Sequence, residues 1–385
     1  MADGDLEHDL AALDAAQRFQ LASQGLDEPR LRDWAAHLLD AGPSVNHVGG
    51  RVEPPAPGDV ADLPAPGSAE AQRLTERGMA ALASGELALV VLAGGMATRM
   101  GGIVKALVEA APGVSFLDAR LAERAYWERR AGAPLPIWLM TSHATDAVIR
   151  DALGERLDGD RVAVFAQGAS LRLTPDGRLF RDGAGQLSLH ATGHGDLPEA
   201  LRQSGLLERF RARGGRYLWI ANLDNLGAAV DPHLLGWHIE HGAPLTVEVV
   251  DKWQGDRGGI PVRLDGRPVV LENFRLPDGF DEDTVRVFNT NTFIAGADAL
   301  YELQMPWTWF RVEKSVDGRP AIQFERLIGE LTSALRSSFL LVPRDGPESR
   351  FIPAKDHAEL DANRAAIWAR VAPYLATAEH RRHGP

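Results

Sequence analysis

Five short apolar runs constrain the fold of this chain more than any other feature of its sequence. They span residues 87–93, 136–142, 161–167, 216–222 and 244–250, and stretches with helical spacing separate several of them. A continuous apolar run of about seven residues is typical of a strand buried on both faces of a parallel sheet. Strands that alternate with helices predict an α/β fold with a doubly wound, mixed sheet. In such folds ligands bind at the carboxyl ends of the strands.

The rest of the sequence predicts three parts of the chain. Residues 1–68 combine a segment with helix-like apolar spacing and a connector rich in proline and glycine over residues 42–67. Residues 69–355 contain the apolar runs and form the predicted main domain. Residues 356–385 form a short C-terminal helical tail.

Composition excludes several classes of protein. The formal net charge of −12 argues against binding to nucleic acid, because phosphate backbones require a basic surface. The absence of cysteine excludes disulfides, thiolate nucleophiles and cysteine-ligated metals. The N-terminus is acidic where a secretory signal is basic and then apolar, and no apolar run approaches the roughly 20 residues that span a bilayer. We therefore expect a cytoplasmic protein with no nucleic-acid or membrane partner, and the sequence leaves its oligomeric state open.

A glycine-rich loop follows the first predicted strand, in the run LVVLAGGMATRMGGIVKAL. Gly94 and Gly95 end the strand, and Arg99 and Lys105 follow within the loop. Glycines let backbone N–H groups approach a phosphate or a base closely, and the two cations can neutralise phosphate charge. The loop matches neither the Walker A pattern nor G-x-G-x-x-G, which disfavours P-loop and hydride-transfer chemistry. The segment predicts a nucleotide-binding loop of another kind.

This loop resembles the opening motif of the UDP-sugar pyrophosphorylases, L-x-G-G-x-G-T-[RS]-[LM]-G followed by a lysine. Ala97 stands where that family usually has glycine, and Lys105 lies one residue closer to the loop than usual. The likeness continues in order from about residue 70 to residue 360. It implies a Rossmann-like, GT-A-like nucleotidyltransferase fold, with residues 69–355 as the catalytic domain.

The string NLDNLGAAVD is the most specific part of the resemblance and matches the UDP-glucose type. The strand before it delivers Asp224 and Asn225 at its carboxyl end. One carboxylate there can hold Mg²⁺ between phosphate oxygens, because the nucleotide and water supply the other ligands. The resemblance therefore implies Asp224 as the magnesium ligand, and it directs Asn222 and Asn225 at ribose or sugar hydroxyls.

Three further segments resemble the nucleotide-binding parts of the family. WLMTSHAT implicates Thr141 beside the uridine, and VFAQGASLRL places Gln167 at the uracil edge. A glutamine amide donates and accepts hydrogen bonds together, which suits the imide edge of a pyrimidine. ATGHGDLPEAL resembles P-P-G-H-G-D and places Gly193 and His194 near the sugar and its phosphate. We expect His194 to donate a hydrogen bond and not to act as a base, since a sugar phosphate is already an anionic nucleophile.

The sugar side of the resemblance lies in predicted hairpin segments at residues 260–276 and 285–295. Gly259 is implied to allow close approach of the sugar, Glu272 to bind its hydroxyls, and Asn291 to face it from the string FNTN. The late segment SRFIPAK implies Lys355 as a second phosphate-binding lysine. We expect no C-terminal β-helix domain of the kind common in the UDP-glucose type, because only about 30 residues follow that lysine.

These motifs predict one reaction and its site. UTP and a sugar 1-phosphate would give a UDP-sugar and pyrophosphate, through in-line attack on the α-phosphorus without a covalent enzyme intermediate. The implied catalytic residues are Arg99, Lys105, Asp224 and Lys355, with Mg²⁺ on Asp224. The implied nucleotide-binding residues are Gly94, Gly95, Thr141, Gln167 and Gly193, and the sugar-binding residues are His194, Asn222, Gly259, Glu272 and Asn291.

The sequence leaves the sugar open. The strings GHGD, NLDNLG and FNTN favour glucose 1-phosphate, whereas the first motif resembles the UDP-N-acetylglucosamine type. The same reaction on another sugar 1-phosphate, such as a galactose or amino-sugar derivative, is the second hypothesis. The departures at Ala97 and Lys105 motivate a third, a nucleotide-sugar-binding protein that has lost catalysis. A glycosyltransferase is disfavoured, because no D-x-D motif follows a suitable strand.

Overall fold

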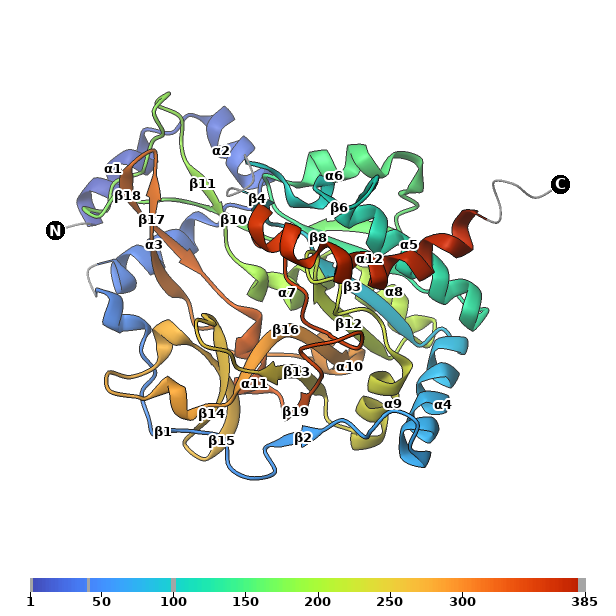
Figure 1. Cartoon of the computed structure of the whole chain (residues 1–385). Coiled ribbons are helices and arrows are strands. Elements are labelled where there is room, and N and C mark those ends of the chain that lie inside the picture. Colours follow the sequence, from blue (N-terminus) through green and yellow to red (C-terminus); the bar gives the residue numbers. More distant parts are fainter. Residues whose placement is uncertain (1–2, 40–41, 98–101, 380–385) are drawn as a thin grey trace.

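The computed structural model describes residues 3–39, 42–97 and 102–379 (Figure 1). Its centre is an eight-stranded mixed sheet with the strand order β2-β19-β13-β16-β12-β3-β8-β9. The strands are β2 (Val60–Asp62), β3 (Leu87–Leu92), β8 (Ile137–Thr141), β9 (Val162–Ala166), β12 (Tyr217–Asn222), β13 (Leu245–Asp251), β16 (Val287–Gly296) and β19 (Ser337–Leu341). All five apolar runs form strands of this sheet, which confirms the predicted fold class.

Helices cover both faces of the sheet, so alternate residues of a strand enter different cores. In β3, Leu87, Leu89 and Val91 pack on one side, and Ala88 and Val90 on the other. The first face is covered by α4 (Ala69–Ala83), α5 (Phe116–Ala131), α6 (Asp146–Leu153), α9 (Pro232–His241) and α12 (His357–Glu379). The second face is covered by α7 (Leu197–Gln203), α8 (Leu206–Ala212), α10 (Ala297–Tyr301) and α11 (Leu331–Ala334).

Smaller sheets extend from the main one and carry the N-terminal helices. These helices pack through Leu31 and Trp34 against Leu171, Ile322 and Phe324, beside β10, β11, β17 and β18 (Figure 1). The helices are α1 (Asp3–Ala11), α2 (Ala15–Ser23) and α3 (Glu28–Leu38). The strands are β1 (Val52–Glu53), β4 (Met96–Ala97), β5 (Ile103–Val104), β6 (Glu109–Ala111), β7 (Val114–Ser115), β10 (Ala169–Leu171), β11 (Leu189–Ala191), β14 (Gly259–Leu264), β15 (Arg267–Glu272), β17 (Phe310–Val316) and β18 (Arg319–Glu325).

Two local expectations need correction. The stretch 42–67 is not simply a connector, because β1 pairs with β14 and β2 pairs with β19 at the edge of the main sheet. The segment 285–295 is not a hairpin but one long strand, β16, which runs antiparallel to both β12 and β13. The hairpin predicted over 260–276 is present as β14 and β15.

The predicted C-terminal helix is present as α12. It packs on α5 through buried Leu360, Ile367 and Val371 (Figure 1). Among the described residues, no helix is both long and apolar enough to cross a bilayer.

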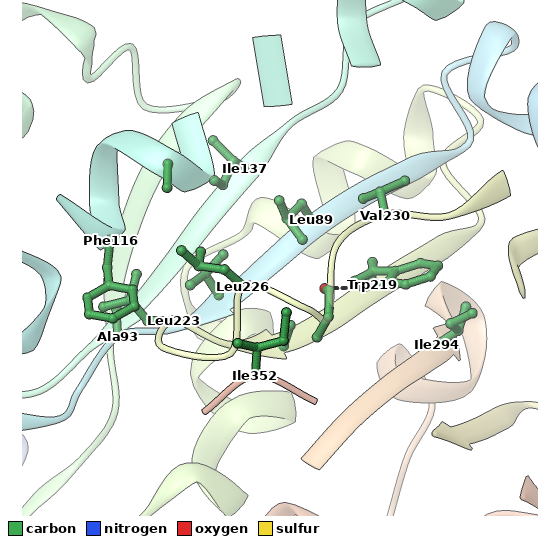
Figure 2. Packing of buried hydrophobic residues seen from close by; sticks show 14 of the residues in the cluster. Leu89, Ala93, Phe116, Ile137, Trp219, Leu223, Leu226, Val230, Ile294 and Ile352 are labelled. Atoms are coloured by element: carbon green, nitrogen blue, oxygen red, sulfur yellow. Dashed lines mark hydrogen bonds between the residues drawn. The ribbon is translucent and has the colours of Figure 1, made fainter. Parts of the chain in front are cut away.

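Part of the main core lies directly beneath the loop that joins β12 to α9. Leu223, Leu226 and Val230 of this loop point into the core, where they pack with Trp219 and Ile352 (Figure 2). The indole N–H of Trp219 donates to the carbonyl oxygen of Ala228 at 3.2 Å. Burial of these apolar side chains fixes the path of the loop, because protein interiors are close-packed and tolerate little displacement.

Two glycines set the separation of α4 and α9. A Cβ on Gly78 would overlap the carbonyl oxygen of Pro232, and a Cβ on Gly236 would overlap that of Leu74. The two helices can therefore approach this closely only with glycine at both positions.

We predict that Gly236→Ala lowers the free energy of unfolding by about 1–3 kcal/mol through overpacking, although alanine is the better helix former. Chemical denaturation measures the change. Ala80→Gly, at an exposed position of α4, is the control and should cost about 1 kcal/mol from helix propensity alone. A stabilised Gly236→Ala would contradict the packing.

Candidate active site

The strands β3 and β12 are parallel neighbours, with Leu92 opposite Asn222 in the ladder. Their carboxyl ends therefore lie side by side, and the loops that follow them meet. Lys105 comes from the first of these loops, and its ammonium group forms an ion pair with the carboxylate of Asp224 from the second. Only 15% and 18% of the two side chains are exposed, so the pair is largely shielded from water.

A cavity of about 460 Å³ opens at this edge of the sheet. Its walls include residues that the sequence assigns to the nucleotide, the phosphates and the sugar, from five separate segments. They are Gly94, Gly95, Lys105, Gln167, Gly193, His194, Asn222 and Asp224. The structure thus brings together most of the predicted site.

Gln167 is held by the loop that carries His194. The backbone N–H of Gly193 donates to Oε1 of Gln167 at 3.1 Å, which leaves the amide Nε2 as the hydrogen-bond donor. A Cβ on Gly94 would overlap that Nε2, so a side chain at this position would displace the amide from where it lies. The amide therefore offers Nε2 as a donor, while one lone pair of Oε1 is engaged by Gly193.

His194 presents a neutral ring with a defined tautomer. The N–H of Ile328 donates to its Nδ1 at 2.9 Å, so the ring proton of the neutral imidazole is on Nε2. Burial lowers the pKa of His194 to about 4, because a low-dielectric environment disfavours the charged ring. His194 therefore has the geometry of a hydrogen-bond donor at neutral pH, as the sequence predicts.

A polar cluster adjoins the cavity at Asn222. Asn291 Nδ2 donates to Asn222 Oδ1 at 2.9 Å, and its backbone N–H donates to Asn289 Oδ1 at 3.0 Å. Asn291 has a φ of 58° and lies where the register of β16 against β13 shifts. A β-bulge of this kind re-aims side chains locally, and here the Asn291 amide reaches Asn222 on the neighbouring strand β12.

Gly259 and Glu272 lie opposite each other on β14 and β15. A Cβ on Gly259 would lie 3.0 Å from Oε1 of Glu272 and 3.2 Å from Nδ2 of Asn289, so the glycine keeps space open between these polar groups. Burial, together with the negative charge of Glu330, raises the pKa of Glu272 to about 7. The cluster thus combines donors and acceptors of the kind that bind sugar hydroxyls.

Among the described residues, neither the cavity wall nor the adjoining polar cluster includes four residues that the sequence assigns to the site: Arg99, Thr141, Asn225 and Lys355. Arg99 lies outside the described residues. The side chain of Thr141 is buried and donates to Asp146 Oδ1 at 2.6 Å, and in its place Met140 lines the cavity. Successive strand residues face opposite sides, so the end of β8 turns Thr141 away from the cavity.

The amide of Asn225 has a structural partner and not a sugar. Its Nδ2 donates to the carbonyl oxygen of Arg350 at 3.1 Å, and its Oδ1 accepts from the N–H of Ile352 at 2.9 Å.

Among the described residues, Lys355 lies outside the cavity wall and is exposed. Burial raises the pKa of Asp256, but hydrogen bonds from Arg344 and Trp253, with the charges of Arg344 and Lys355, outweigh it and lower that pKa. Lys355 therefore lies near that carboxyl.

Two buried charged residues of α5 brace the loop that carries Asp224. The guanidinium of Arg120 donates to the carbonyl oxygens of Asn222 at 2.8 Å and Asn225 at 2.7 Å. Glu123 pairs with Arg120 and accepts from the N–H of Val230 at 2.7 Å. The motifs did not reveal this brace. The one feature that points to it is that Arg120 and Glu123 are opposite charges three residues apart among the buried residues of α5.

Asp224 is the carboxylate at the end of β12 that could hold a metal ion, and Glu325 is a second carboxylate in the described cavity wall. Within the described ranges, no group of three or more histidine, aspartate or glutamate side chains could hold one. Mg²⁺ in nucleotide sites commonly takes one or two carboxylates and completes its shell with phosphate oxygens and water. The donor set at Asp224 therefore fits an ion shared with a triphosphate.

The sequence profile of a family described as UTP–glucose-1-phosphate uridylyltransferase matches residues 52–384. The chain belongs to this family. It is 34% identical over 219 residues to a probable UTP–glucose-1-phosphate uridylyltransferase of Schizosaccharomyces pombe, covering 53% of the chain and 43% of that protein. It is 28% identical over 306 residues to the UTP–glucose-1-phosphate uridylyltransferase of Hordeum vulgare, covering 75% and 64%. The chain thus spans less than two thirds of the length of these relatives.

Solved structures show the same fold. A UDP-glucose pyrophosphorylase variant from Leishmania major, in complex with UDP-glucose, matches with a TM-score of 0.72 at 23% identity, over 92% of the chain and 80% of that structure. The UDP-N-acetylglucosamine pyrophosphorylase of Trypanosoma brucei matches with a TM-score of 0.73 at 22% identity, over 93% and 81%. The expected family and fold are confirmed, and helices α1 to α3 precede residues 52–384, which the family profile matches.

The raised pKa of Glu272 predicts a pH-dependent cost to stability. The folded state keeps the proton up to about pH 7, whereas the unfolded chain loses it near 4.5, so stability falls as pH rises through this interval. We predict that Glu272→Gln is more stable than the parent at pH 8 by roughly 1–3 kcal/mol and gains little at pH 5. Denaturant unfolding at both pH values measures this. An equal effect at the two pH values would contradict the assignment.

Proposed function

We propose that this chain transfers UMP from UTP to a sugar 1-phosphate, with release of pyrophosphate, and that glucose 1-phosphate is the preferred acceptor. The observation that carries the proposal is the meeting of Lys105 and Asp224 in a cavity that Gln167, His194 and Asn222 also line. Membership of the family and the names of the relatives support the same reaction.

The chemistry needs charge compensation more than it needs a base. A phosphate oxygen of the sugar 1-phosphate forms a bond to the α-phosphorus of UTP, and the bond to pyrophosphate breaks on the opposite side. The nucleophile is already an anion, so the neutral His194 suits donation to a phosphate oxygen. Lys105 neutralises part of the charge, as Arg99 does in the expected site. Mg²⁺ at Asp224 would supply further charge neutralisation when bound with the nucleotide.

We propose that Lys355 binds the same phosphates from outside the cavity wall. Ile352 is bonded to Asn225, the neighbour of Asp224. Three residues of extended chain span at most about 11 Å, and the lysine side chain adds several more. We therefore retain Lys355 as the second phosphate-binding lysine, which engages the substrate from outside the cavity wall.

A panel of sugar 1-phosphates tests the reaction and the choice of sugar. With UTP and Mg²⁺, pyrophosphate release should be fastest with glucose 1-phosphate and slower with galactose 1-phosphate and N-acetylglucosamine 1-phosphate. Faster release with another sugar would support the second hypothesis. Binding of UTP or UDP-glucose in calorimetry without any pyrophosphate release would instead support a protein that has lost catalysis.

The role of Asp224 predicts a large loss of turnover. Asp224→Asn keeps the shape of the side chain but removes the charge that pairs with Lys105 and would hold the metal. We expect kcat to fall by about two to three orders of magnitude. Asp298→Asn, at an exposed carboxylate that pairs with Arg211, is the matched control and should leave kcat unchanged. Near-parental turnover of Asp224→Asn at saturating Mg²⁺ would refute the role.

The role of Lys355 predicts a separate loss. Removing a cation that stabilises the transferring phosphate or the leaving group should lower the turnover of Lys355→Ala by about two orders of magnitude. Steady-state pyrophosphate release measures it, and exposed Lys314→Ala on β17 serves as control. If Lys355→Ala had the same turnover as the parent and as Lys314→Ala, the phosphate-binding role of Lys355 would be refuted.

A further inference from the structure

The last residue of the GHGD string, Asp196, has no role in the site described above, yet only 2% of it is exposed. Its carboxylate lies between the segment that carries Gln167 and the loop that carries His194. Oδ2 accepts from the backbone N–H of Gly168 at 2.8 Å and from the hydroxyl of Thr192. Asp196 therefore ties the residue after Gln167 to the residues just before His194.

Arg326 completes this connection from the end of β18. Its guanidinium donates to Oδ1 of Asp196, and it lies over the rings of Trp307 and Trp309, with ring-centre distances of 5.1 and 4.9 Å. Its backbone N–H donates to the carbonyl oxygen of Thr192 at 2.9 Å, and its carbonyl oxygen accepts from Gly195 at 3.0 Å. The loop 192–196 is thus held from both sides.

Two hydrogen-bond donors of the site, those of Gln167 and His194, depend on where this loop lies. The N–H of Gly193 fixes the orientation of the Gln167 amide, and the N–H of Ile328, two residues after Arg326, fixes the tautomer of His194. Space is tight, because a Cβ on Gly193 would lie 3.2 Å from the backbone nitrogen of Arg326. A shift of the loop would therefore release the amide of Gln167 to turn over.

We infer that the Asp196–Arg326 pair is a positioning element that sets the base preference of the nucleotide site for uracil over cytosine. The inference rests on the proposed function. The Nε2 donor of Gln167 matches the carbonyl oxygen at C4 of uracil and opposes the amino group of cytosine. An amide that is free to turn accepts from that amino group through its oxygen, so the discrimination is lost when the pair is broken.

The test compares the kcat/KM ratio for UTP over CTP, with Mg²⁺ and saturating glucose 1-phosphate. Asp196→Asn should lower this ratio by about tenfold or more, since one unfavourable donor–donor contact is removed. Asp59→Asn is the matched control. Like Asp196, Asp59 pairs with an arginine, Arg263, and accepts a backbone N–H, from Ala56, with 8% of its side chain exposed. Asp59 uses both oxygens for its arginine, whereas Asp196 uses Oδ1 alone. Asp59→Asn should keep the parental ratio.

Two results would overturn the inference. In one, Asp196→Asn slows the reactions of UTP and CTP equally, as a purely structural residue would. In the other, Asp59→Asn changes the ratio as much. A second variant, Arg326→Lys, covers the case in which Asp196→Asn does not fold. It keeps the charge but loses the planar donor geometry, so it should also lower the ratio of kcat/KM for UTP over CTP. If the parent releases no pyrophosphate, the proposed function fails. Calorimetry then tests the inference by the ratio of UDP to CDP affinity, which Asp196→Asn should lower and Asp59→Asn should leave unchanged.

Discussion

The pairing of β3 with β12 is the constraint on which the rest of the site depends. Because the strands are parallel and Leu92 lies opposite Asn222, the glycine-rich loop and the Asp224 loop leave the sheet at the same edge. β8 pairs with the other side of β3, and β9 pairs with β8, all in parallel. Gln167, which follows β9, therefore lies at the same edge of the sheet. Residues far apart in the sequence meet in one cavity because the order of the strands requires it.

Buried charges then fix the loops that the strands deliver. Arg120 with Glu123, and Arg350 with Glu248, hold the loop of Asp224, while Asp196 with Arg326 holds the loop of His194. Buried ion pairs are weak evidence for stability, because the cost of removing charges from water offsets much of their attraction. Their partners here are mainly backbone N–H and carbonyl groups of two loops, so we interpret them as devices that fix loop geometry.

Much of the fold and of the site can be predicted from the sequence, because apolar runs mark buried strands and the motifs follow the strand ends. The loop braces cannot be predicted in this way. Arg120 donates to carbonyl oxygens about 100 residues away, and backbone carbonyls leave no pattern in a sequence. The interpretations of Thr141 and Asn225 differ from the structure for a related reason. Thr141 ends a strand, where neighbouring side chains face opposite ways, and composition does not show which one faces the cavity. Asn225 lies in the loop after β12, where its amide bonds to distant backbone groups that leave no pattern in the sequence.

A crystal structure of the chain with UDP-glucose and Mg²⁺ tests the central claim most directly. We expect uracil on Nε2 of Gln167, a phosphate oxygen on Nε2 of His194, and sugar hydroxyls on Asn222 and Asn291, each at a hydrogen-bond distance of about 3 Å. We also expect the metal ion between Asp224 and the phosphates. A nucleotide bound away from the edge shared by β3 and β12, or phosphates remote from Asp224, would contradict the claim.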